Sequence, residues 1–207
     1  MKEKGQRRLT ILIILVLITA IGTIGILTNK NKNLEMKYDT KPLNDPELEE
    51  IYYGEKNAEN EILFVFDYSC PACHEWIISI FPEIKNSFID PGVAKFRTQS
   101  MVYLNDDSLK FSNFDQNLKR KYPKQYFEIL FDLLTYDPAN GIEHNLLEAI
   151  NKYDLSDELL NKPTFDSLNI TRKYTRNLNV EVVPTIYVNG NKIDDPFNLK
   201  EIKRNLN

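Results

Sequence analysis

The sequence is poor in the residues from which metal sites and disulfide frameworks are built. It contains only two cysteines and two histidines in 207 residues. Both cysteines lie in the tetrapeptide CPAC, residues 70–73, and a bridge closing so short a loop stabilises a fold by only about 2 kcal/mol. A zinc site needs four ligands, and only His74 and His144 remain as soft donors. We therefore expect neither a disulfide-stapled scaffold nor a metal site.

The chain also lacks the excess of basic residues that is typical of nucleic-acid-binding proteins. Lys and Arg number 26 against 30 Asp and Glu, a net charge of −4. Residues 1–8 hold four basic residues and one acidic residue, so the remainder holds 22 basic and 29 acidic residues, a net of −7. An acidic body argues against binding nucleic acid through a surface that neutralises phosphates.

Residues 9–28 contain no charged side chain at all. As a helix this segment spans about 30 Å, the thickness of the hydrocarbon core of a bilayer. Basic residues precede it, so it predicts a single-pass cell-membrane anchor, with residues 1–8 as a cytoplasmic tail and the body outside. A cleaved signal peptide is the alternative, but the apolar run continues past its candidate cleavage site, residues 20–22. No cysteine directly follows the run, which excludes lipid attachment through a lipobox thiol.

Residues 29–48 are polar, contain Pro42 and Pro46, and show no apolar period. This composition predicts a linker between the membrane and a folded body. The folded body then comprises residues 49–207, a length that suits one domain.

The first half of this domain shows strand signals around one helix. ILFVF at 62–66 is a continuous apolar run typical of a strand buried on both faces. A short strand is predicted at 51–53 and another at 93–97. Between them, a helix is expected from His74 to Phe88, kinked by Pro82.

The second half predicts a helical block followed by more strands. Apolar residues recur at helical spacing within 105–179, interrupted by Pro and Gly. Thr185–Val188 then predicts a strand, Asn189-Gly190 a two-residue hairpin turn, and 196–206 a closing helix. The order of elements predicts an α/β domain with an inserted helical subdomain at about 105–179.

The position of the two cysteines favours redox chemistry. Cys70 falls between the buried strand and the helix, where unpaired N–H groups and the helix dipole stabilise a thiolate. Pro71 suits the first helical position because it has no N–H to leave unpaired. Cys73 lies one turn further on and should be more buried. We expect Cys70 to attack and be attacked, and Cys73 to resolve the mixed disulfide.

Two stretches of the sequence resemble a known family. IYYGEKNAENEILFVFDYSCPACHEW at 51–76 and VEVVPTIYVNG at 180–190 resemble the DsbA family of thioredoxin-fold thiol–disulfide oxidoreductases. Within it, the chain is most similar to the membrane-anchored BdbD-like proteins of Gram-positive bacteria. The resemblance extends over about 49–207 and implies a thioredoxin fold.

The resemblance also implies roles for residues at the far end of the chain. It implies that the Val183–Pro184 peptide bond is cis and that Pro184 packs against the active-site disulfide. The backbone of Val183 would pair with an extended substrate segment, and Pro71 and Ala72 would also contact substrate.

The sequence departs from the family pattern near the cysteines. Members usually bury a Glu or Asp six residues before the first cysteine, where this chain has Phe64. Asp67 is nearer in sequence, and we expect it to face solvent. Strongly oxidising relatives have His where this chain has Ala72. His74 is a candidate for tuning the thiolate, although an exposed helix residue is the simpler interpretation.

The sequence thus predicts an extracytoplasmic dithiol oxidase that introduces disulfides into exported proteins. It would need no cofactor beyond the Cys70–Cys73 disulfide, and a DsbB-like, quinone-linked membrane oxidase would reoxidise it. One alternative is a membrane-anchored reductase of the cytochrome c maturation type, although such enzymes usually have Trp where this chain has Ser69. Another is a thioredoxin-like binding module whose cysteines are idle.

Overall fold

The computed structural model describes residues 37–41, 51–136 and 141–206. No helix within these ranges is long and apolar enough to cross a membrane. The anchor predicted for 9–28 lies outside the described residues.

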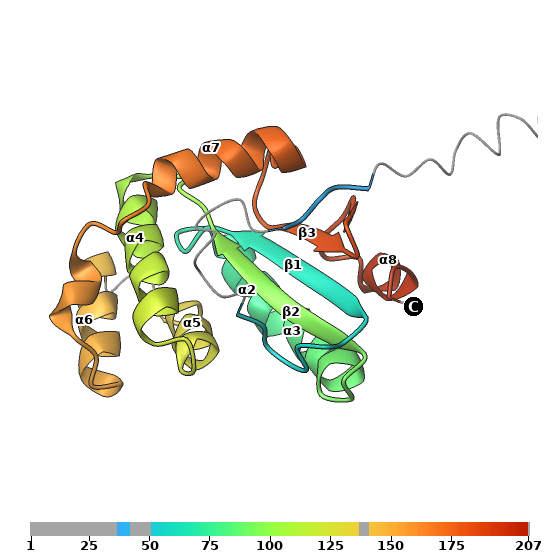
Figure 1. The fold of residues 1–207 in the computed structure, drawn as a ribbon, viewed down its shortest axis with the longest axis horizontal. Helices are drawn as coiled ribbons and strands as arrows, with labels where there is room; N and C mark the ends of the chain where they lie inside the picture. Colours follow the sequence, from blue (N-terminus) through green and yellow to red (C-terminus); the bar gives the residue numbers. More distant parts are fainter. Residues whose placement is uncertain (1–36, 42–50, 137–140, 207) are drawn as a thin grey trace, which may run out of the picture. The chain divides into compact units, whose positions relative to one another are not determined.

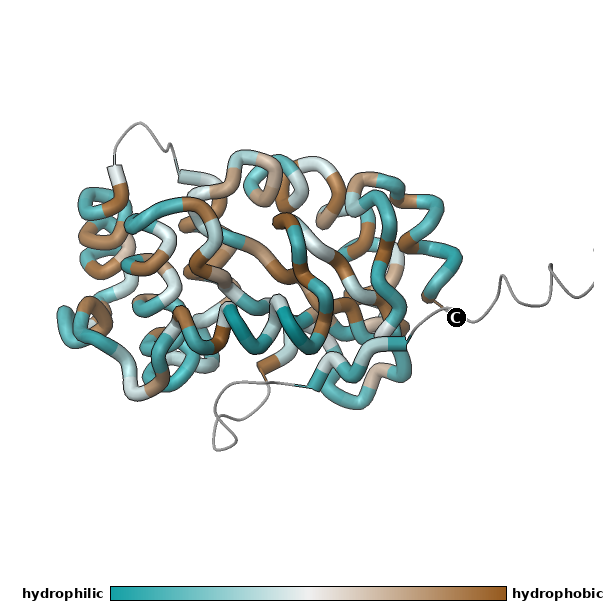
Figure 2. The backbone as a smooth tube through the Cα atoms, turned by 90° about the horizontal axis from the view of Figure 1, so that it is seen from above, coloured by the Kyte–Doolittle hydropathy of each residue, from teal (hydrophilic) through white to brown (hydrophobic). Residues whose placement is uncertain are grey.

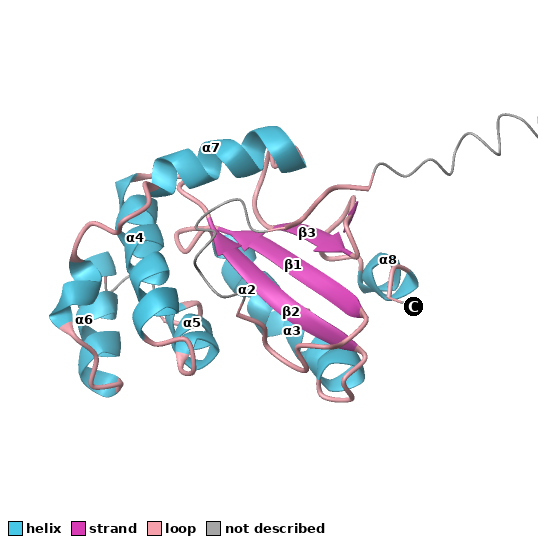
Figure 3. Cartoon of the chain, viewed as in Figure 1, coloured by secondary structure: helices cyan, strands magenta, loops and turns pink. Residues whose placement is uncertain are grey.

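A four-stranded sheet forms the centre of the domain, in the order β2-β1-β3-β4 (Figures 1 and 3). β1 (Asn60–Phe66) runs parallel to β2 (Ala94–Ser100) and antiparallel to β3 (Thr185–Val188). β4 (Asn191–Lys192) pairs antiparallel with β3 across the Asn189-Gly190 turn. The apolar run at 62–66 is fully buried, which confirms the predicted central strand.

The two faces of β1 pack against different helices, because successive side chains of a strand point to opposite sides. Phe64 and its neighbours at 62 and 66 join the larger core with α2 (Pro71–Ser79), α3 (Phe81–Ile84) and α8 (Leu199–Arg204). Leu63 and Val65 join a smaller core with α7 (Ser167–Leu178). Hydrophobic stretches accordingly run through the strands at the centre of Figure 2.

Helices fill the chain between β2 and β3, as predicted for the insertion at 105–179. The side chain of Asn105 caps the first of them by accepting from the Ser108 N–H. The inserted elements before α7 are α4 (Asp106–Lys121), α5 (Tyr126–Leu133), α6 (Ile142–Lys152) and a 3₁₀ turn (Asp157–Leu160).

Some predicted boundaries were wrong. The helix predicted at 74–88 begins earlier, at Pro71, and ends at Ser79. It is followed by α3 and by a π-helix (Lys85–Ile89). Pro82 lies in the first turn of α3, where its missing N–H costs no hydrogen bond. The predicted strand at 51–53 is reduced to one bridge between Tyr53 and Phe96.

The closing helix is also shorter than predicted. It begins at Leu199 because the Asn198 side chain caps it by accepting from the Glu201 N–H. It ends at Arg204 rather than Leu206.

Part of the predicted linker packs against the domain. Tyr38 donates its N–H to the Gly190 carbonyl at 2.7 Å, and its ring lies 5.5 Å from that of Tyr187. The Thr40 carbonyl accepts from Arg97. Residues 37–41 therefore belong to the folded unit, which begins at Lys37.

Candidate active site

Cys70 lies at the N-cap of α2, directly after the turn that leaves β1. Its backbone is extended, its N–H donates to the Asp67 carbonyl at 3.0 Å, and its carbonyl accepts from the N–H of Cys73 at 3.0 Å. Pro71 occupies the first helical turn. The thiol of Cys70 therefore lies where unpaired N–H groups and the helix dipole favour a negative charge.

The two cysteines are free thiols with very different surroundings. Cys70 is 6% exposed and Cys73 is completely buried. A hydrogen bond from the Cys73 thiol, helped by the N–H groups of Cys73 and Ala72, lowers the pKa of Cys70 to about 6, although burial and Asp67 oppose the shift. Burial, followed by the bond to Cys70, raises the pKa of the Cys73 thiol. At neutral pH Cys70 is thus a thiolate and Cys73 a thiol.

The segment before β3 closes over this thiol pair. The Val183–Pro184 peptide bond is cis, as the resemblance implied. The Cys70 Sγ atom lies 3.4 Å from the Val183 carbonyl oxygen and donates to it when the thiol is protonated. Pro184 is buried, Val183 is half-buried, and Val182 is 63% exposed. Residues more than a hundred positions apart in sequence thus meet at one sulfur.

Comparison with known proteins agrees with this arrangement. Residues 47–207 match the family described as Thioredoxin. The chain belongs to the thioredoxin family. It is 25% identical to disulfide bond formation protein D of Bacillus subtilis over 163 residues, 74% of this chain and 73% of that one. It is 26% identical to a probable disulfide bond formation protein D of Bacillus cereus over 213 residues, 95% of this chain and 94% of that one.

Solved structures share the fold. BdbD from Bacillus subtilis in its oxidised form superposes with a TM-score of 0.59 at 20% identity, covering 76% of this chain and 90% of that one. The thiol–disulfide exchange protein alpha-DsbA2 from Wolbachia pipientis gives 0.60 at 17% identity, covering 77% and 87%. With its paired cysteines, the chain is a thiol–disulfide oxidoreductase with a DsbA-like thioredoxin fold.

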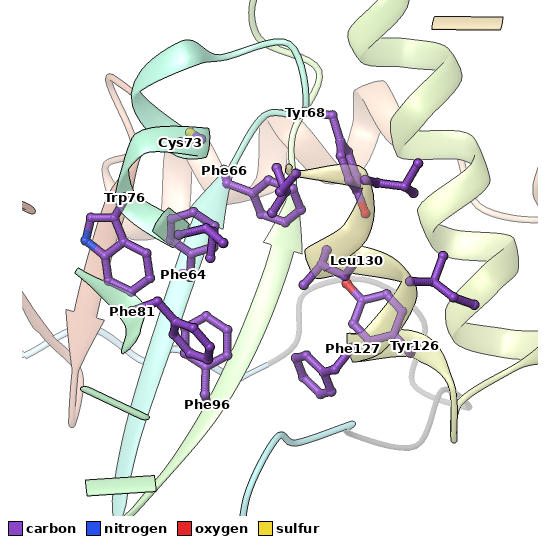
Figure 4. Packing of buried hydrophobic residues seen from close by; sticks show 14 of the residues in the cluster. Phe64, Phe66, Tyr68, Cys73, Trp76, Phe81, Phe96, Tyr126, Phe127 and Leu130 are labelled. Atoms are coloured by element: carbon purple, nitrogen blue, oxygen red, sulfur yellow. The ribbon is translucent and has the colours of Figure 1, made fainter. Parts of the chain in front are cut away.

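Aromatic packing occupies position 64, where the family resemblance would place a buried acid. The Phe64 ring stacks on Trp76 with centroids 4.6 Å apart and on Phe66 at 5.1 Å, as Figure 4 shows. The Trp76 indole N–H donates to the Pro196 carbonyl at 2.8 Å. Trp76 is therefore a core residue, and no carboxylate at position 64 serves Cys73.

Asp67 does not face solvent, so that expectation was wrong. Its side chain is completely buried. Its Oδ1 accepts from the Ser69 N–H at 2.8 Å, and its Oδ2 accepts from the N–H groups of Tyr103 at 2.8 Å and Leu104 at 3.2 Å. Two of these donors come from a segment about 36 residues later in the chain, which local sequence does not reveal.

The two histidines lie apart from the sulfurs' hydrogen bonds. The Nε2 atom of His74 lies 2.6 Å from the Tyr68 carbonyl oxygen. His74 therefore hydrogen-bonds to the turn before Cys70 and not to the thiol. His144 lies on α6, with its Nε2 3.5 Å from a Glu148 carboxylate oxygen. Within the described residues, no three His, Cys, Asp or Glu side chains gather as a metal site.

A second buried carboxylate lies on the other side of Tyr68 and was missed by sequence reasoning. Asp115 on α4 accepts from the hydroxyls of Tyr68 at 2.9 Å, Tyr126 at 2.8 Å and Ser100 at 2.9 Å, and pairs with Lys119 at 3.1 Å. Burial, followed by the nearby Asp115 charge, raises the pKa of both tyrosines. The i,i+4 spacing of Asp115 and Lys119 was the available signal, but such pairs are usually exposed.

Proposed function

We propose that this oxidoreductase works as a dithiol oxidase, forming disulfides in exported proteins. The observation that carries the proposal is the position of Cys70 at the N-cap of α2 beside the Cys73 thiol, whose hydrogen bond lowers the pKa of Cys70 to about 6. A thiol–disulfide pair is a strong oxidant when its reduced form is stabilised, and a low-pKa thiolate is the usual means. The direction also fits the names of the relatives, which are disulfide bond formation proteins.

The reaction begins with the Cys70–Cys73 disulfide. A substrate thiolate attacks the Cys70 sulfur, the bond to Cys73 breaks, and Cys73 leaves as a thiolate that takes up a proton because its pKa is raised. The second substrate thiolate then attacks the substrate sulfur of this mixed disulfide. Cys70 leaves as a thiolate, the substrate gains a disulfide, and two electrons remain on the reduced cysteine pair. Because the pKa of Cys70 is low, it is a good leaving group.

The surface around Cys70 suits an extended substrate segment. The half-buried Val183 offers its backbone beside the sulfur, and the exposed Pro71 and half-buried Ala72 border the same sulfur from α2. We include these three residues as substrate contacts and Pro184 as the residue that shapes the segment.

The proposal extends to location and reoxidation. The uncharged residues 9–28 with basic residues before them support a single-pass anchor and an extracytoplasmic domain. A DsbB-like, quinone-linked membrane oxidase would return the cysteine pair to the disulfide. Protease added outside intact protoplasts should digest the domain, and only detergent should release the protein from membranes. Resistance to the external protease would contradict this location.

The reduction potential of the purified protein tests the direction of the reaction. Equilibration with glutathione should give a value between those of thioredoxin, about −270 mV, and DsbA, about −120 mV. The oxidised protein should also oxidise a two-cysteine peptide, and the Cys70→Ser variant should not. A reduction potential at or below that of thioredoxin would favour a disulfide reductase. A wild-type protein that oxidises no dithiol would favour a binding module whose cysteines are idle.

A trapping experiment tests the separate roles of the two cysteines. Without Cys73, the mixed disulfide between Cys70 and substrate has no internal thiol to resolve it. The Cys73→Ala variant should therefore accumulate substrates linked through Cys70, visible as bands that disappear on reduction. The absence of such bands with Cys73→Ala, or their appearance with Cys70→Ala, would contradict the assignment.

A further inference from the structure

Three chain segments meet around Cys70, and hydrogen bonds join them into one unit. They are the turn at 67–70, the segment at 101–104 that follows β2, and the segment at 181–183 that precedes the cis proline, called here the pairing segment. Asp67 joins the first two, and the Met101 N–H also donates to the carbonyl of Phe66, the last residue of β1, at 2.7 Å.

Asp67 suits this joining role because a carboxylate only accepts hydrogen bonds. It is completely buried and receives three backbone N–H groups, one from Ser69 in the turn and two from Tyr103 and Leu104. An amide side chain at this position would direct its own NH₂ group against one of these donors. Removing the carboxylate would therefore weaken the connection between the turn and 101–104.

Tyr103 joins this middle segment to the pairing segment. Its backbone N–H is held by Asp67 and its hydroxyl donates to the Glu181 carbonyl. The next carbonyl, that of Val182, accepts from the Thr185 hydroxyl at 2.6 Å. The third, that of Val183, accepts from the thiol of Cys70.

The third of these bonds differs from the other two because it requires a protonated Cys70 thiol. In the disulfide, and in the Cys70 thiolate, the sulfur has no proton to donate. The Val183 carbonyl is then released from Cys70 while the carbonyls of Glu181 and Val182 stay bonded to Tyr103 and Thr185. The oxidised protein thus presents a fixed segment with one carbonyl beside the sulfur free to accept a substrate N–H.

We infer that Asp67 and Tyr103 are positioning residues, which hold the pairing segment beside Cys70 so that an extended polypeptide substrate binds at the Val183 carbonyl. This inference rests on the proposed function. A segment held in its binding conformation before substrate arrives binds more tightly, because less ordering is needed on binding. The effect should be confined to substrates long enough to pair with the backbone.

The Tyr103→Phe variant tests the inference, because it removes only the hydroxyl. The oxidised full-length protein would be assayed with a reduced two-cysteine peptide and with dithiothreitol, which is too small to pair with Val183. We expect KM for the peptide to rise roughly three- to tenfold, the effect of one lost hydrogen bond, with kcat within about twofold. The rate with dithiothreitol and the alkylation profile of Cys70, with its midpoint near pH 6, should not change.

Tyr136→Phe is the matched control. The Tyr136 hydroxyl donates to the Asp132 carboxylate at 3.0 Å in the helical insertion, so this variant also loses one tyrosine hydroxyl bond, to a carboxylate instead of a carbonyl, away from the sulfur. It should leave KM for the peptide unchanged. An equal rise in KM in both variants would overturn the inference, since a general loss of stability would then explain it.

Asp67→Asn provides a second, independent readout. It should raise KM for the peptide as Tyr103→Phe does, and should also move the alkylation midpoint of Cys70 to lower pH, because the carboxylate charge opposes the thiolate. If this variant does not fold, Tyr103→Phe decides alone.

The outcomes separate the inference from the proposed function. An unchanged peptide KM in folded Tyr103→Phe, or an equal loss of rate with dithiothreitol, would overturn the positioning role while leaving the oxidase intact. A wild-type protein that oxidises neither substrate would instead overturn the proposed function.

Discussion

Asp67 and Asp115 are both completely buried; Asp67 directly precedes Tyr68, and Asp115 accepts from the Tyr68 hydroxyl. The two carboxylates differ in the kind of hydrogen-bond donor that surrounds them. Asp67 accepts only backbone N–H groups in the hydrogen bonds of its carboxylate. Asp115 accepts from tyrosine and serine hydroxyls and pairs with the ammonium group of Lys119. Among the described residues no cation pairs with Asp67, so its negative charge disfavours the thiolate form of both cysteines. The charge of Asp115 is balanced by Lys119, so this carboxylate mainly holds neighbouring elements together.

The regions around Asp67 and Asp115 therefore have different roles in the fold. The Cys73 hydrogen bond lowers the pKa of Cys70 and burial raises that of Cys73, and the buried Asp67 charge opposes the first shift and adds to the second. Around Asp115 on α4, hydroxyl bonds join this helix to the turn before Cys70, to α5 and to β2, and Lys119 on the same helix balances the charge. The first region should therefore control reactivity and the second stability.

The largest effect should come from breaking the second region. Asp115→Ala leaves the buried Lys119 without its anion, and removal of one partner of a buried pair costs about 3–5 kcal/mol. Urea unfolding of oxidised protein measures this loss, while the alkylation midpoint of folded Cys70 should stay near pH 6. Asp115→Asn, which keeps an acceptor, should lose less. If the free energy of unfolding of Asp115→Ala fell by less than about 1 kcal/mol, the usual range for exposed pairs, the stabilising role of the Asp115 region would be contradicted.

A smaller effect should come from adding a donor to the first region. In the Ala72→His variant, a side-chain hydrogen bond to the Cys70 thiolate would add about 1.5–3 kcal/mol of stabilisation to the reduced form. For this two-electron couple, that corresponds to a rise of roughly 30–65 mV in reduction potential. Glutathione equilibration of wild type and variant measures the rise. An unchanged or lower potential would mean that the thiolate is already saturated with donors.

The pH dependence of stability should differ between the reduced and oxidised proteins. The pKa of folded Cys70, about 6, lies below the roughly 8.5 of an unfolded thiol. The Cys70 thiolate therefore stabilises the reduced form fully only above about pH 8.5, the pKa of the unfolded thiol, and this stabilisation is lost as pH falls through 6. At pH 7.5 it should amount to about 2 kcal/mol. Denaturation of both forms from pH 5 to 8 checks this, and parallel curves would contradict it.

The sequence predicted those parts of the structure that depend on local pattern. The buried run at 62–66, the helical insertion, the Asn189-Gly190 turn and the N-terminal position of Cys70 on its helix all follow from periodicity or turn chemistry. The cis bond before Pro184 came from family resemblance, since a sequence alone favours trans.

The missed features depend on partners that are distant in sequence. Asp67 is buried because its N–H donors arrive from Tyr103 and Leu104. Residues 37–41 belong to the domain because Tyr38 meets the turn at Gly190. Nothing in the composition around these residues distinguishes them from solvent-facing loops, so only the tertiary arrangement reveals them.

Selective alkylation distinguishes a reactive Cys70 thiolate from a buried Cys73 thiol. Reduced, folded protein would be treated briefly with iodoacetamide from pH 4 to 9, and the labelled cysteine would be identified by peptide mass analysis. Only Cys70 should be labelled, at a rate that rises through a midpoint near pH 6. Label on Cys73 first, or a midpoint near the ordinary thiol value of about 8.5, would contradict these roles of the two cysteines.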